Sequence, residues 1–74
     1  MTVIDMAATG RNIRDLRLAA GMTIRDVRAA CGVSSAAVTK WQSGRALPTL
    51  DNMVVLADLW SVHIDDIIVV QTLQ

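Results

Sequence analysis

Residues 23–44 read TIRDVRAACGVSSAAVTKWQSG, and this stretch decides how the chain folds. It contains two pairs of apolar residues at helical spacing, Val27 with Cys31 and Val38 with Trp41. Between the pairs lies a break at which Gly32 can take a positive φ without a Cβ clash. The chain can then reverse within about three residues. The stretch therefore predicts two short helices joined by a tight turn, which is a helix-turn-helix.

Both helices of this motif are preceded by a residue that can cap the first turn. The Thr23 side chain can accept a hydrogen bond from a backbone N–H in that turn, and Asp26 stands where a capping-box acid reaches back. Ser34 takes the same place before the second helix. We therefore expect the two helices to begin directly after Thr23 and Ser34.

A further helix is expected before the motif. Asp5 can cap a helix that continues to about residue 20, where Gly21 ends it. Its inward residues are Ile13 and Leu16. Gly10 lowers the helix propensity by about 1 kcal/mol relative to Ala, so the first turn is expected to fray.

The chain after the motif predicts a loop and two more helices. Pro48 cannot continue a helix, and either Thr49 or Asp51 can cap the next one, at residues 50–60. Its inward face is expected to hold Leu50, Met53, Leu56, Ala57 and Trp60. Ser61 then stands where a glycine would be favoured if the backbone is left-handed. A last short helix, residues 64–68, is expected to cover the core as a lid through Ile64, Ile67 and Ile68.

The length of 74 residues leaves room for one domain, residues 1–74, with its core at residues 5–68. The five expected helices give an all-α fold class, a compact five-helix bundle with the helix-turn-helix at its centre. The apolar tail at residues 67–73 is rich in β-branched residues. It is expected either to pair with Val3 and Ile4 as a short terminal β-ribbon or to form part of a dimer contact.

Composition also bears on the cellular compartment. No apolar run approaches the roughly 20 residues of a membrane span, and the first residues lack the pattern of an export signal. The one cysteine, Cys31, has no partner in the chain and falls on a buried helix face, which indicates a small core residue. We therefore expect a cytoplasmic protein with no membrane contact.

The formal net charge is zero, but the charges are unevenly spread along the chain. All seven basic residues lie between positions 11 and 45, where only Asp15 and Asp26 oppose them. Most of the other acids lie after position 50. This polarity favours a partner that carries phosphates and approaches from one side. The alternative from charge alone is a solvated helix surface.

Several landmarks of the sequence resemble the phage-repressor-like helix-turn-helix family, also called Cro/C1-type or XRE. They are Gly21, Thr23, residues 32–34, Val38, Trp41, Gly44, Pro48, residues 56–57 and Val62. The resemblance covers residues 8–68. It implies a lambda-repressor-like bundle and a DNA-binding transcriptional regulator that inserts the helix at residues 34–43 into the major groove of double-stranded DNA.

The resemblance also implies which residues contact DNA. If Val38 and Trp41 face the core, the outward residues match those that read bases in the family: Ser35, Ala36, Thr39 and Lys40. Lys40 is the one strong donor among them and can reach guanine, whereas Ala36 can only contact a thymine methyl group. Phosphate contacts are expected from Arg11, Arg14, Thr23, Ser34, Ser43 and Arg45, because phosphate needs only positive charge or a donor at the groove rim.

Three positions depart from the family pattern. Ile24 stands where the family usually has a phosphate-binding glutamine, and Arg28 where the residue is normally small. The Arg28 stem is expected either to reach into solvent or to loosen the helix crossing. Gln42 replaces an acid that often pairs with the arginine matching Arg17. Arg17 is then expected either to hydrogen-bond the amide or to be free for phosphate.

The sequence does not suggest catalysis, a cofactor, a metal site or a small-molecule ligand. No nucleophile, base and orienting group occur together, and His63 has no second ligand at metal-binding spacing. Asp65 and Asp66 point apart on a helix, so we expect them to favour its positive end rather than form an acid/base pair. Both Trp41 and Trp60 are expected in the core.

Two functions from different classes remain open at this point. The first is a transcriptional regulator that binds a palindromic operator as a homodimer, because two copies on half-sites about 34 Å apart gain affinity over one. The second is a protein-interaction module that keeps the scaffold but reads no bases. The zero net charge, the small side chains of the second helix and the missing glutamine favour the second.

Overall fold

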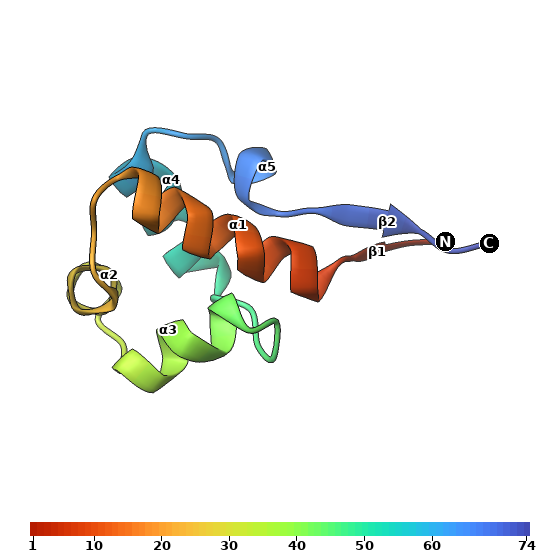
Figure 1. The fold of residues 1–74 in the computed structure, drawn as a ribbon. Helices are drawn as coiled ribbons and strands as arrows, with labels where there is room; N and C mark the ends of the chain where they lie inside the picture. Colours follow the sequence, from red (N-terminus) through yellow and green to blue (C-terminus); the bar gives the residue numbers. More distant parts are fainter.

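The computed structural model describes residues 1–74 and contains five helices and two short strands (Figure 1). Every helix and the ribbon expected from the sequence are present, so the predicted fold is confirmed. In chain order the elements are β1 (Thr2–Ile4), α1 (Met6–Ala19), α2 (Ile24–Cys31), α3 (Ser35–Gln42), α4 (Leu50–Trp60), α5 (Ile64–Ile67) and β2 (Val70–Thr72). None of the helices combines the length and apolar character needed to span a bilayer.

The helices pack around α1, which crosses the middle of the molecule (Figure 1). On one side α1 contacts α3, and on the other it contacts α5. All five helices contribute to one cluster of eight buried hydrophobic residues: Ile13, Val27, Val38, Trp41, Met53, Leu56, Ala57 and Ile67. Because α2 and α4 also touch, the helix-turn-helix is held against the rest of the chain at both of its helices.

Two inward positions expected on α4 differ in the structure. Leu50 is 73% exposed, so the prediction that it faces the core is wrong. It is the first residue of α4 and shares the outer side of the helix with the exposed Val54, four residues on. Trp60 packs against the core but stays partly exposed, and its buried Nε1 has no hydrogen-bond partner.

Gly10 is a contact point rather than a weak point of α1. It is buried against the end of α3, where an added Cβ would lie 2.5 Å from the Trp41 carbonyl oxygen and 2.7 Å from that of Gln42. Both atoms belong to the backbone, so neither can move aside as a side chain would. The prediction of a frayed first turn misses this contact, because the partner atoms lie far away in the sequence.

The two ends of the chain form the antiparallel ribbon that was one of the two alternatives for the apolar tail. Strands β1 and β2 pair Thr2 with Thr72 and Ile4 with Val70. The buried Thr9 fastens this ribbon to α1, since its Oγ1 accepts the Val69 N–H at 2.9 Å. The ribbon projects beyond the helices, with both chain ends at its tip (Figure 1).

A Gly10→Ala variant is expected to lower the free energy of unfolding by about 1–3 kcal/mol, because the methyl group overpacks the α1–α3 contact. In an open helix the same change raises stability by about 1 kcal/mol, so the two explanations differ in sign. Urea unfolding followed by circular dichroism measures the change. Asp15→Ala, at an exposed site on the same helix, is the control and should shift stability by about 0.5 kcal/mol at most. An unchanged or higher stability of Gly10→Ala contradicts the close contact.

Ser61 ends α4 in the left-handed region, with φ of 54°. A glycine there removes the Cβ strain, so Ser61→Gly is expected to raise stability by roughly 0.5–1 kcal/mol, which is a few degrees in Tm. Ser43 ends α3 with φ of −85°, so Ser43→Gly is the matched control and should lower stability. If both variants change Tm in the same direction, strain at Ser61 is not the cause.

Candidate nucleic-acid interface

Helix α2 begins with the capping box expected from the sequence. The Thr23 Oγ1 accepts the Asp26 N–H at 3.1 Å, and the Asp26 Oδ2 accepts the Thr23 N–H at 2.9 Å. Hydrogen bonds to the Asp26 carboxyl from the Thr23 backbone N–H and, to a smaller extent, from the Thr23 side chain lower its pKa from the usual 3.8. The box therefore fixes the start of the motif and keeps a negative charge at the positive end of α2.

The turn between α2 and α3 also has the expected geometry. Gly32 ends α2 with φ of 67°, in the left-handed region. Two residues later the Ser34 Oγ accepts the Ala37 N–H at 3.1 Å and caps α3. The first N–H groups of α3 have no partner inside the helix, so they point at whatever approaches this end.

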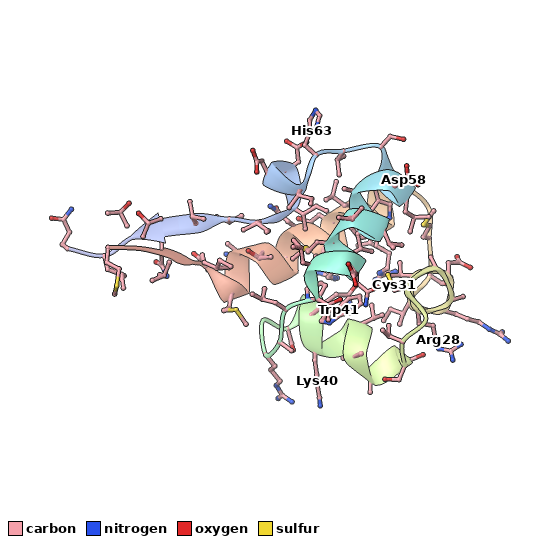
Figure 2. The ribbon with its side chains drawn as sticks, turned by 180° about the vertical axis from the view of Figure 1, so that it is seen from behind. Arg28, Cys31, Lys40, Trp41, Asp58 and His63 are labelled. Carbon is pink, nitrogen blue, oxygen red and sulfur yellow. The ribbon has the colours of Figure 1, made fainter.

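Helix α3 has one buried and one open side. Val38 and Trp41 lie in the core, Trp41 being 5% exposed. The four residues expected to read bases, Ser35, Ala36, Thr39 and Lys40, are all exposed. Lys40 points away from the body of the molecule, whereas Trp41 points into it (Figure 2). The structure thus brings the four predicted residues together on one uncovered helix face.

The position of α3 against α1 is fixed by Arg17. Its Nε donates to the Gln42 Oε1 at 2.8 Å, and its Nη1 donates to the Met22 carbonyl at 2.9 Å. Of the two alternatives for Arg17, the hydrogen bond to the amide is the one observed. Residues i and i+6 on a helix differ by about 120° in direction, so Arg17 faces inward although Arg11 on the same helix is exposed.

The side chains expected at the groove rim are also open to solvent. Arg11, Arg14 and Arg45 are exposed, and none of their side chains hydrogen-bonds within the chain. Arg14 lies four residues after Gly10, so it is on the side of α1 that approaches α3. Arg11 is turned about 60° further from that side. Arg14 is therefore the nearer of the two to a ligand held by α3.

The three hydroxyls expected at the rim differ in what they can donate. Both Thr23 and Ser34 act as acceptors in their caps, which leaves the Ser34 hydrogen for a phosphate oxygen, whereas the Thr23 side chain also hydrogen-bonds the Asp26 carboxylate. The Ser43 hydroxyl instead donates to the Lys40 carbonyl at 3.1 Å. Ser43 must release that bond before it can donate to a phosphate.

The departures at Ile24 and Arg28 take simple forms. Ile24 is partly buried and packs against the core, so it offers no polar group at the start of α2. Arg28 is exposed and points away from the helices (Figure 2), which agrees with the first of the two alternatives for its stem. Neither residue disturbs the packing of α2 on α3.

The thiol of Cys31 and the side chain of Asp66 have surroundings that indicate structural rather than chemical roles. Burial raises the pKa of the Cys31 thiol, which disfavours the reactive thiolate. The Asp66 Oδ2 accepts the His63 N–H at 2.9 Å, so this acid supports the start of α5 as expected. The structure contains no pocket, and no three His, Cys, Asp or Glu side chains converge.

Two further residues shape this surface: the role of Gly10 was not predicted from the sequence, and that of Gln42 was one of two alternatives. Gly10 sets how closely α3 approaches α1, and Gln42 holds Arg17. The signal available in the sequence was the position of Gly10 inside a helix pattern, because a glycine in a helix interior has either a packing reason or a stability cost.

Two capped helices, a left-handed glycine turn and a second helix with an open polar face define the class of protein: a helix-turn-helix domain. A family model described as a helix-turn-helix domain matches residues 8–66, so the chain belongs to this family. The resemblance noted from the sequence landmarks is thereby confirmed. No curated protein matches the sequence significantly.

Solved structures show the same fold. The restriction-modification controller protein C.AhdI from Aeromonas hydrophila superposes with a TM-score of 0.76 at 22% identity, over 85% of this chain and 96% of that one. The clp gene regulator ClgR from C. glutamicum gives a TM-score of 0.73 at 21% identity, over 84% of this chain and 80% of that one. Both similarities establish the architecture.

The Asp26→Ala variant tests the capping box through pH. The pKa of Asp26 is lowered on folding, so its carboxylate stabilises the folded state above the ordinary pKa, and this contribution is lost as the pH falls through the folded value. The difference in unfolding free energy between wild type and variant should therefore be largest near neutral pH and shrink below about pH 4. Urea unfolding at a series of pH values measures it.

Asn52→Ala is the control, because Asn52 holds the same position after the Thr49 cap of α4 and has no ionisable group. Its difference from wild type should not depend on pH. If the Asp26→Ala difference is equally flat, the carboxylate makes no contribution to the cap.

Proposed function

We propose that this protein is a DNA-binding transcriptional regulator whose helix α3 enters the major groove. The observation that carries the proposal is the uncovered side of α3, where four small or basic residues stand opposite the buried Val38 and Trp41. The major groove admits one α-helix and presents a different donor and acceptor pattern for each base pair. Membership of the helix-turn-helix family supports it, and so do the two structural neighbours, a controller protein and a gene regulator.

Base reading on this surface depends mainly on Lys40. Its ammonium group is long enough to reach guanine O6 or N7, whereas Ser35 and Thr39 can bond to either base type. Ala36 offers a methyl group that suits a thymine methyl. Direct readout is therefore modest, with one strong donor per copy.

Phosphate contacts would supply most of the affinity. We propose that Arg14 and Arg45 bind phosphates on the two sides of α3, with Arg11 further out, because their guanidinium groups are free of internal bonds. The Ser34 hydroxyl adds a donor at the start of α3, and the Thr23 hydroxyl adds one at the start of α2 only if it leaves the Asp26 carboxylate. Ser43 joins them only if it leaves the Lys40 carbonyl.

Modest readout by one copy favours a homodimer on a palindromic operator. Two copies would place their α3 helices in successive major grooves, about 34 Å apart, and so double the number of base contacts. Selection of bound duplexes from a randomised library, at low and at moderate salt, tests this. A palindrome with half-sites one helical turn apart is the expected result. No enrichment at either salt would contradict sequence-specific binding and favour the interaction-module alternative.

On the selected operator, Lys40→Ala and Arg45→Ala are expected to weaken binding in different ways. Loss of Lys40 should relax the preference at one base pair per half-site, at a cost of about 1–3 kcal/mol for the preferred sequence. Loss of Arg45 should weaken binding about equally on all sequences and reduce the slope of log affinity against log salt by about 1. Fluorescence anisotropy on the operator and on single-base variants separates the two.

The matched control is Asp58→Ala. Asp58 lies on α4, on the side of the molecule away from Lys40 (Figure 2), and its removal changes the net charge by one. Affinity should change little if local contacts rather than net charge control binding. Identical losses from Lys40→Ala and Arg45→Ala on every sequence would contradict the separate roles.

A further inference from the structure

The terminal ribbon differs from the rest of the surface in having no charged side chain. All fourteen charged residues lie from Asp5 to Asp66, so β1, β2 and the residues between these strands and the chain ends carry none. Several large apolar side chains are nevertheless exposed there: Met1 81%, Ile4 37%, Val70 59% and Leu73 45%. Exposed sheet edges normally carry charges or prolines that prevent pairing with another strand. This ribbon has neither.

Only half of the backbone N–H and C=O groups of the ribbon form hydrogen bonds between its two strands. Met1 and Leu73 bond to each other in both directions, at 2.7 and 3.2 Å, and the Asp5 N–H donates to the Val69 carbonyl at 2.7 Å. Bonded and unbonded pairs alternate along an antiparallel ladder. The pairs Thr2 with Thr72 and Ile4 with Val70 are therefore the unbonded ones, and their N–H and C=O groups point outward.

The outer edge of β2 is the more open of the two edges. All three residues of β2 are exposed, whereas Val3 of β1 is half-buried. Val70 is also more exposed than its partner Ile4. A sheet of two short strands is marginally stable in water unless it gains further strands or packs against a helix, and only the base of this ribbon is fastened to α1, through Thr9 and Val69. The ribbon thus has an open edge at which a further strand can pair.

We propose that the outer edge of β2 is the contact between two copies of this chain, which join their ribbons into one four-stranded antiparallel sheet. Under a two-fold axis at Gln71 β2 pairs with itself, so the outward N–H and C=O groups of Val70 in one copy meet those of Thr72 in the other. The exposed Val70 side chains of the two copies then lie on the same face of the joined sheet, as neighbours across the two β2 strands. This inference specifies the contact of the homodimer proposed above, and it rests on that proposal.

The charge pattern identifies a second copy as the occupant. Apart from the ammonium group of Met1 at its tip, the ribbon carries no charge that would attract a charged peptide, and the uncharged side chains of two ribbons meet without repulsion. The ribbon also projects to one side of the helices, while Lys40 points in a different direction (Figures 1 and 2). A partner copy on the ribbon therefore leaves the open face of α3 free for DNA.

Two pairs of variants test the contact, with the mass of the full chain measured by sedimentation equilibrium in the absence of DNA. Thr72→Pro removes an outward N–H from β2 without touching the bonds between β1 and β2, and Thr2→Pro does the same on β1. Val70→Lys places like charges at the two-fold contact, and Val54→Lys adds the same charge on α4, where Val54 is 54% exposed. Circular dichroism of each variant checks that the helices remain.

The wild type is expected to be dimeric, with the dissociation constant raised about tenfold or more by Thr72→Pro and Val70→Lys. Thr2→Pro and Val54→Lys should leave it unchanged. A monomeric wild type overturns the inference. So does loss of the dimer in Thr2→Pro with retention in Thr72→Pro, which would place the contact on β1.

The outcome is separable from that of the DNA proposal. A ribbon-dependent dimer that selects no DNA leaves this inference standing and contradicts the proposed function. A palindromic operator bound equally by wild type, Thr72→Pro and Val70→Lys upholds the function and overturns the ribbon contact.

Discussion

The close approach of α1 to the end of α3 is the constraint on which the rest of the structure depends. Gly10 lies against the backbone carbonyls of Trp41 and Gln42, and Arg17 holds the Gln42 side chain from the same helix. This contact seats Trp41 in the core, and the seating of Trp41 turns Lys40 and Thr39 outward. The open face of α3 is therefore held in place by residues on the opposite side of that helix, which are not among those proposed to contact DNA.

Much of the fold follows from local chemistry that can be recognised in the sequence. The capping box of Thr23 and Asp26, the Ser34 cap and the left-handed Gly32 all involve residues within a few positions of one another. The spacing of these residues in the sequence is therefore enough to predict the caps and the turn, and these predictions are confirmed. The burial of Leu50, the first residue of α4, could not be predicted in this way. Helical spacing places it near the apolar side of the helix, but no other helix covers it in the structure.

Some features of the candidate site also follow from local spacing, whereas others depend on contacts between residues far apart in the sequence. The outward residues of α3 follow from the period of the helix once Val38 and Trp41 are buried. The bond between Arg17 and Gln42 joins residues 25 positions apart, and spacing alone left it as one of two alternatives. The role of Gly10 depends on backbone atoms of another helix, and an isolated helix pattern shows only its cost in propensity. Which DNA atoms the open face contacts depends on the ligand, and that remains a prediction.

The bond between Thr9 and Val69 has a consequence for how the protein forms during synthesis. It joins residues 60 positions apart, and the ribbon joins residues still further apart in sequence. The helix-turn-helix can form from contacts between neighbouring residues while the chain is still emerging from the ribosome. The buried hydroxyl on α1 must wait until residue 69 has been made. Closing the two ends therefore cannot precede the synthesis of residue 69, and until then the Thr9 side of α1 lacks its partner.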